Sequence, residues 1–176
     1  PITPPIGLAY LKAVASNYTK DVTVIDSIGN YPKIRVEKFD GETIRLLGES
    51  GDDIVDRIDS HTEIVLVSCM FSQDWLYAVQ IIRKLKQKCP NSLIVAGGEH
   101  ISAAPEYSLT TAPELDICVM GEGELVLSEL LAKYINDDPL DDIPRTLVRG
   151  MNNSRREETT RDRTKSRIKD LSTISW

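Results

Sequence analysis

The chain has 176 residues, of which 41% are hydrophobic and 27% charged, a composition typical of one globular domain and not of a disordered chain. Its net charge is −6 and its pI about 5.0, which argues against a general nucleic-acid-binding surface because such domains are usually basic. No apolar run approaches the ~18 residues of a transmembrane helix. Cys69, Cys89 and Cys118 form no CxxC pair, which excludes a disulfide scaffold or zinc ribbon and favours the reducing cytoplasm.

The first third of the chain predicts a helix, a strand, a hairpin and a second, shorter helix. Apolar residues at helical spacing predict an amphipathic helix over residues 6–18. The β-branched run DVTVID predicts a strand over 21–26. A central Asp-Gly turn predicts a β-hairpin insertion within 27–48. Ser50 opens the pattern of a capping box, which predicts a short helix through Ile58.

From residue 63 onward, apolar strands alternate with amphipathic helices. The sequence predicts strands over 63–70, 92–98 and 116–124, and helices over 74–88, about 104–111 and 124–134. These strands are apolar on both faces, which is typical of a parallel sheet that helices cover on both sides. We therefore expect an α/β fold with a doubly wound, flavodoxin-like or Rossmann-like parallel sheet in three αβα layers.

The character of the chain changes after residue 136. An acidic linker over 137–142 precedes a predicted edge strand over 145–150. Residues 151–167 are polar and weakly basic, as in a loop or hairpin tip, and the last residues are expected to return as a second strand. This divides the chain into a domain over 1–136 and a linker with a hairpin extension over 137–176.

Small and hydroxyl-bearing residues follow three of the predicted strands. Ligands of open parallel sheets bind at the carboxyl ends of the strands, and glycine lets a ligand approach the main chain closely. These turns therefore predict a shallow, neutral, main-chain-lined crevice for a large and mostly uncharged cofactor, which would suit a triphosphate poorly. The residues are Ser68, Phe71 and Ser72 in the first turn, Gly97, Gly98, Glu99 and His100 in the second, and Gly121, Glu122 and Gly123 in the third.

Each of these features also has a simpler structural explanation. Gly97 and Gly98 are typical of a tight strand-to-helix turn. The G-E-G-E sequence is typical of a turn whose carboxylates favour a helix N-terminus. His100 is either a helix-start residue that bonds to a backbone group or, less often, a metal ligand, and Ser72 is a possible cap of the next helix.

The order of the motifs is more specific than any one of them. PPIGLAYLKAV, VIDS, VSCMFSQDW, IVAGGEHISAAPE and DICVMGEGE follow one another, and the chain over residues 4–176 resembles the cobalamin-binding domain of cobalamin-dependent radical SAM enzymes. The resemblance implies that cobalamin lies over the strand ends with its nucleotide tail beside the sheet, and that this chain supplies contacts but no catalytic or metal-ligating residue. The implied contacts are Pro5, Gly7, Leu8, Ser68, Phe71, Ser72, Gly97, Gly98, Glu99, His100, Gly121, Glu122 and Gly123.

Three departures from the family pattern shape these expectations. The family's first, central strand should precede Pro1 and lie between residues 21–26 and 63–70, so the chain is interpreted as an N-terminal fragment. The D-x-H-x-x-G motif is absent, so no histidine ligand to cobalt is expected. The C-x-x-x-C-x-x-C motif is absent too, so the [4Fe-4S] cluster and S-adenosylmethionine are expected to bind a radical SAM domain further along the same polypeptide.

The implied reaction of that parent enzyme is methyl transfer to an unactivated carbon, with ring formation or rearrangement as an alternative. The expected partners are cobalamin and the radical SAM domain, without nucleic acid or membrane. Replacement of Gly98 by leucine is expected to abolish cobalamin retention without unfolding the sheet.

Two other functions compete with this interpretation. A receiver-like regulatory or nucleotide-binding domain would need an acidic cluster at its first strand ends and a later lysine, but Asp26 is alone and no lysine follows ICVM. A corrinoid carrier that works in trans is disfavoured by the missing D-x-H-x-x-G motif.

Overall fold

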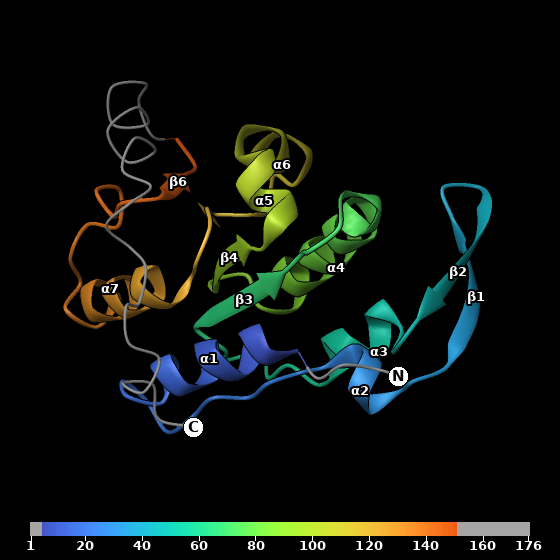
Figure 1. Ribbon diagram of the computed structural model, residues 1–176, viewed down its shortest axis with the longest axis horizontal. Helices are drawn as coiled ribbons and strands as arrows, with labels where there is room; N and C mark the ends of the chain where they lie inside the picture. The colour runs from blue at the N-terminus through green and yellow to red at the C-terminus, as the bar shows by residue number, and fades with distance from the viewer. Residues whose placement is uncertain (1–4, 151–176) are drawn as a thin grey trace.

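The computed structural model describes residues 5–150, which form a sheet covered by helices and a separate hairpin (Figure 1). The helices are α1 (Ile6–Ala15), α2 (Ser27–Asn30), α3 (Gly51–Asp56), α4 (Trp75–Lys88), α5 (Glu99–Ala103), α6 (Pro105–Thr111) and α7 (Glu124–Ile135), with a 3-10 turn η1 (Ser72–Asp74). The strands are β1 (Ile34–Phe39), β2 (Glu42–Leu47), β3 (Ile64–Ser68), β4 (Leu93–Gly97), β5 (Ile117–Val119) and β6 (Thr146–Val148). The expected return strand lies outside the described residues.

The main sheet has the order β3-β4-β5-β6. Strands β3, β4 and β5 are parallel, and β6 joins β5 antiparallel, which confirms the predicted parallel sheet and the predicted edge strand. Ser68 pairs with Gly97, and Ala96 pairs with Cys118, so the three parallel strands end at one edge of the sheet. The turns that follow them are therefore neighbours in space.

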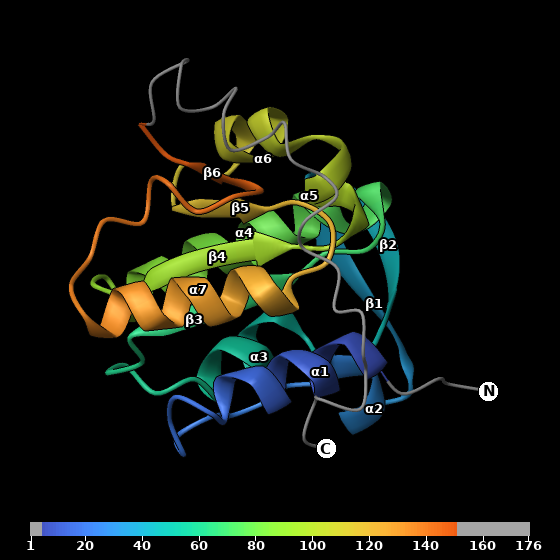
Figure 2. The same cartoon turned by 60° about the vertical axis from the view of Figure 1, so that its left-hand side comes forward.

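Helices cover both faces of this sheet, as Figure 2 shows. Side chains alternate between the faces, so Ile94 and Ala96 of β4 belong to one apolar core and Val95 to the other. The first core includes Trp75 and Ile82 of α4, and the second includes residues of α1 and α7. The predicted three-layer αβα architecture is confirmed.

The structure confirms the predicted hairpin and capping box, which are local features. Asp40 and Gly41 connect β1 to β2 and both have positive φ angles, of 49° and 82°, as the tight hairpin turn requires. Ser50 Oγ accepts a hydrogen bond from the Asp53 amide at 3.0 Å, and Asp53 accepts one from the Ser50 amide in return. The hydrogen bonds from Ser50 hold the pKa of Asp53 below its ordinary value.

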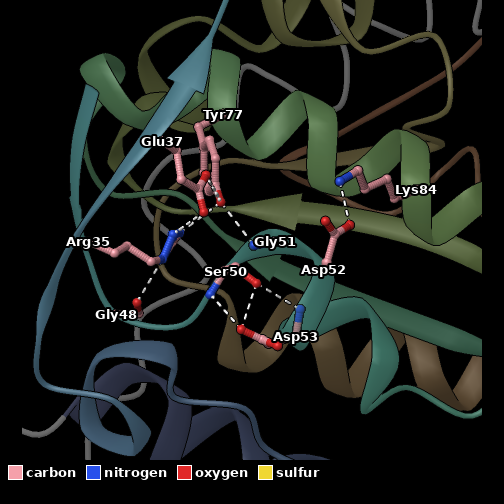
Figure 3. Close-up of polar contacts among 9 residues, drawn as sticks. All are labelled: Arg35, Glu37, Gly48, Ser50, Gly51, Asp52, Asp53, Tyr77 and Lys84. Carbon is pink, nitrogen blue, oxygen red and sulfur yellow. Dashed lines mark hydrogen bonds and ion pairs between the residues drawn. The ribbon is translucent and has the colours of Figure 1, made fainter. Parts of the chain in front are cut away.

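Tyr77 of α4 connects the β1-β2 hairpin to the rest of the domain through hydrogen bonds (Figure 3). Its hydroxyl accepts hydrogen bonds from Arg35 Nη2 at 2.8 Å and from the Gly51 amide at 2.9 Å, and it donates to Glu37 Oε2 at 3.1 Å. Arg35 also pairs directly with Glu37. Burial raises the pKa of Tyr77, so the hydroxyl remains protonated and can donate. One side chain therefore connects β1, α3 and α4.

We expect Tyr77→Phe to destabilise the domain by about 1–2 kcal/mol, because Gly51 and Arg35 lose an acceptor in a partly buried place. Denaturant unfolding measures this loss. Tyr31→Phe is the control, since Tyr31 is exposed. Equal stability of the two variants would contradict the role assigned to Tyr77.

The prediction of a strand over residues 21–26 is wrong. These residues form no strand, and among residues 5–150 no strand lies beside them. Strand β3, which the flavodoxin-like order would place two positions away, lies at the edge of the described sheet. An apolar alternating run becomes a strand only when a neighbour satisfies its main-chain groups.

Three helix and strand boundaries also differ from the expectation. Helix α1 ends at Ala15 and α3 ends at Asp56. Helix α6 confirms the predicted helix over about 104–111, whereas the short helix α5 before it was not predicted. Strand β5 ends at Val119, because the chain turns at Gly121 with a φ angle of 75°.

Candidate functional site

The strand-end turns, residues 68–72, 97–100 and 121–124, form a connected edge at the carboxyl ends of β3, β4 and β5. The first and second turns are joined through Cys69, whose amide donates to Gly97 O at 2.9 Å and whose carbonyl accepts from the His100 amide at 3.3 Å. These bonds extend the parallel ladder past the end of β3. The main chain of both turns is therefore held in place without a ligand.

Ser102 of α5 joins the second turn to the third. Its Oγ donates to Gly98 O at 2.9 Å and accepts from the Gly121 amide at 2.7 Å. No motif in the sequence marks Ser102, although a serine four positions after Gly98 on a short helix is placed to bond back to that carbonyl. All three strand-end turns thus share one hydrogen-bonded framework.

Gly98 is required by the turn itself. Its φ angle is 105°, and a Cβ at this position would lie 2.4 Å from Cys69 O. This contact contradicts the expectation that Gly98→Leu leaves the sheet undisturbed, because the added side chain collides with the main chain of the first turn. Gly97 differs, since its Cβ would lie 3.8 Å from Val119 O, an ordinary contact distance.

His100 and Ser72 bond to each other across the first two turns. His100 is 5% exposed, its ring stacks on Trp75 with the centroids 4.8 Å apart, and its Nδ1 lies 2.9 Å from Ser72 Oγ. Its Nε2 is buried without a hydrogen-bond partner among the described residues. Ser72 makes no capping bond, because its hydroxyl faces His100. Among residues 5–150, no group of three or more His, Cys, Asp and Glu side chains could hold a metal ion.

Burial lowers the pKa of His100, because the imidazolium is costly to desolvate. The unfolded chain therefore binds this proton more readily than the folded chain, so the contribution of neutral His100 to stability is complete above about pH 6.5 and is lost as the pH falls.

We expect the melting temperature of the wild type to fall more between about pH 7.5 and about pH 5.5 than that of His100→Gln. His61→Gln is the control, because His61 is exposed. The same pH slope for His100→Gln and the wild type would contradict this assignment.

The contact residues proposed from the sequence differ in their solvent exposure. The α1 helix lies beside the third turn, where a Cβ on Gly123 would be 3.3 Å from Leu11 Cδ2. Large apolar side chains are exposed in the first turn and at the start of α1: Phe71 is 64% exposed and Ile6 61%. His100 is buried, and the half-buried residues are Leu8, Gly97, Gly98 and Gly123. The exposed residues are Pro5, Gly7, Ser68, Phe71, Ser72, Glu99, Gly121 and Glu122.

A parallel sheet with helices on both faces and hydrogen-bonded turns at its carboxyl edge defines a domain of the doubly wound α/β class. The model of the B12-binding domain family matches residues 1–131, and the chain belongs to this family. No helix within residues 5–150 has the length and apolar character needed to span a bilayer.

The relatives of this chain are much longer enzymes. It is 31% identical over 91 residues to the cobalamin-dependent radical SAM methyltransferase TokK of Streptomyces tokunonensis, covering 52% of this chain and 12% of that protein. It is 28% identical over 142 residues to the cytidylyl-2-hydroxyethylphosphonate methyltransferase of Streptomyces wedmorensis, covering 80% and 26%. The chain thus spans about a quarter or less of these relatives.

A solved structure shares the fold. The radical S-adenosylmethionine methyltransferase TsrM of Kitasatospora setae, with cobalamin and a [4Fe-4S] cluster bound, aligns with a TM-score of 0.60 and 18% identity over 84% of this chain and 24% of that one. These comparisons confirm the resemblance that the order of motifs indicated.

Proposed function

We propose that this chain holds cobalamin across its strand-end turns for a longer radical SAM enzyme. The observation that carries the proposal is the hydrogen-bonded framework that joins three strand-end turns, two of which contain glycine, at one edge of the sheet. Main-chain groups at such an edge suit the amide side chains of a corrin, which are costly to leave unpaired. Exposed Phe71 and Ile6 add apolar surface for the macrocycle.

The residues of this chain would bind and orient the cofactor. Ser68 lies exposed at the end of β3, where its hydroxyl is placed to bond to a bound ligand, and Gly97 offers a surface without a side chain. The cobalamin would supply a transferable methyl group, and the [4Fe-4S] cluster and S-adenosylmethionine would be held by the radical SAM domain. The sequence has no C-x-x-x-C-x-x-C motif, so the cluster ligands are not in this chain.

The proposed division places the cobalamin domain in residues 1–136 and a linker with a hairpin in 137–176, leading to the radical SAM domain in cis. The names and lengths of the relatives support this arrangement, and methyl transfer is the proposed reaction of the whole enzyme. The three cysteines are free and buried, which agrees with the proposed cytoplasmic location.

A receiver-like function has less support. Asp26, its candidate acidic residue, accepts a hydrogen bond from the Gly29 amide at 2.9 Å and caps α2. The discriminating experiment adds hydroxocobalamin to the complete protein and records the visible spectrum after gel filtration. A co-eluting base-off spectrum supports the proposal, whereas a colourless protein that reacts with acetyl phosphate overturns it.

Gly7 offers a test of the proposed contact residues at the start of α1. A Cβ at Gly7 meets no atom within 4 Å, so a side chain fits there without disturbing the fold. We expect Gly7→Ala to be as stable as the wild type or up to about 1 kcal/mol more stable, because alanine favours a helix. We expect Gly7→Trp to fold but to weaken cobalamin binding about tenfold or more, since the indole would occupy cofactor space.

Equilibrium dialysis with hydroxocobalamin measures this effect. Lys12→Trp, on the same helix and likewise at an exposed position, is the matched control. Unchanged affinity of Gly7→Trp would remove Gly7 from the proposed contacts.

A further inference from the structure

Ser102 has a fixed position in the fold, although it lies on a helix of only five residues. Helix α5 is anchored by its buried side chains His100 and Ile101, which are 5% and 0% exposed. The amide and the hydroxyl of Ser102 both donate to Gly98 O, each at 2.9 Å. The hydroxyl oxygen is therefore held beside the second turn.

The main-chain ladder that joins β4 to β5 stops before the third turn. Within the described residues, this pairing ends at Ala96 opposite Cys118. Beyond it, the Met120 amide donates to Arg145 O at 2.9 Å, on the side of β6. Gly121 follows with a φ angle of 75°, and glycine restrains the main chain less than any other residue. The third turn therefore separates from the second where β4 and β5 end.

A side chain joins the two turns at this point. Ser102 Oγ accepts a hydrogen bond from the Gly121 amide at 2.7 Å while it donates to Gly98 O. A hydroxyl can donate and accept at once, which an aliphatic side chain cannot do. The first and second turns differ, because main-chain bonds of Cys69 join them.

These bonds determine how Ser102 could affect a ligand. Its proton is bonded to Gly98 O, and the Gly121 amide is bonded to its oxygen, so neither group remains as a donor for a cofactor. The bridge can instead supply geometry. A rigid ligand that contacts both turns binds more tightly when their spacing is set before binding, because the turns then need no further ordering.

We propose that Ser102 is a positioning residue that sets the spacing of the second and third turns for cobalamin. This inference rests on the proposed function, because cobalamin is the ligand that would span the two turns. The residue acts through Gly98 and Gly121, not by contact with the cofactor.

The test measures affinity and stability separately on the complete protein, by spectrophotometric titration with hydroxocobalamin and by thermal unfolding without it. We expect Ser102→Ala to bind hydroxocobalamin about tenfold or more weakly than the wild type. Its melting temperature should fall by about 4 °C or less, because Gly121 is exposed and water can replace the lost acceptor. A variant that stays folded during the titration loses affinity only if the site itself has changed.

Two further variants make the test specific to the hydroxyl. Ser102→Thr retains it and should bind within about threefold of the wild type. Ser108→Ala is the matched control, because the Ser108 hydroxyl on α6 makes the same kind of bond, to Ala104 O at 2.8 Å, and no bond to a strand-end turn among the described residues. Its affinity should stay within about twofold of the wild type.

Hydrogen exchange of the cofactor-free protein tests the bridge itself. Amides within residues 120–123 should exchange about tenfold faster in Ser102→Ala than in the wild type, and the wild-type rate should return in Ser102→Thr.

The inference is overturned if Ser102→Ala binds hydroxocobalamin as tightly as the wild type. It is equally overturned if Ser102→Thr loses as much affinity as Ser102→Ala, since the hydroxyl would then not be the determinant, or if Ser108→Ala shows the same loss. In each of these cases the wild type still binds cobalamin, and the proposed function stands. A wild type that binds no cobalamin contradicts the proposed function, and the inference fails with it.

Discussion

Replacement of Gly98 by alanine is expected to destabilise the domain by about 3 kcal/mol. Two costs add at this position. The added Cβ would lie 2.4 Å from Cys69 O and 2.8 Å from Cys69 C, so the main chains of the first two turns would have to separate. The φ angle of 105° is also one that side-chain-bearing residues rarely adopt. The hydrogen bonds of Cys69 to Gly97 and His100 would weaken together.

Denaturant unfolding of the two variants Gly98→Ala and Gly97→Ala gives a matched comparison of adjacent positions. The Cβ of Gly97→Ala meets Val119 O at 3.8 Å, so we expect a change of about 1 kcal/mol or less. Gly97→Ala is therefore the better probe of cofactor binding, because loss of cobalamin from a stable variant reports contact. Equal stability of the two variants would show that the second turn adapts without cost.

The parts of the fold that depend on neighbouring residues in sequence were predictable. The Asp-Gly turn at residues 40–41 sets the hairpin, and Ser50 with Asp53 sets the start of α3, each through contacts within a few positions. The apolar strands β3, β4 and β5 were predictable for a related reason, because strands buried on both faces carry continuous apolar runs. Their parallel arrangement then placed the strand-end turns at one edge.

Contacts between distant residues were not predictable. The bond between Ser72 and His100, the bridge from Ser102 to Gly121 and the packing of Arg145 on Gly121 join residues 19 to 28 positions apart. No local pattern marks these pairs, since each depends on how two turns meet after the sheet has formed. The sequence pattern predicted which turns lie at one edge of the sheet, but not which side chains are turned inward.

Strand β3 lies at an open edge of the described sheet, with no strand paired to its outer side within residues 5–150. Leu66 in this strand is 40% exposed although the strand is apolar, and residues 22–25 make no main-chain hydrogen bond to any residue within 5–150. Both segments have the composition of interior strands. A further strand between them would pair with the main-chain groups of both segments.

We therefore expect a polypeptide that includes an apolar strand upstream of Pro1 to be more stable than residues 1–176 alone, by about 3 kcal/mol or more. Several main-chain hydrogen bonds would form on each side of the added strand, and amides within 22–25 should exchange with solvent on the order of 100-fold more slowly. Hydrogen exchange with mass spectrometry measures this difference, and the hairpin tip at Asp40 and Gly41 serves as the internal control. Unchanged exchange over 22–25 would show that this segment stays outside the sheet, and the flavodoxin-like strand order would then not apply to this part of the chain.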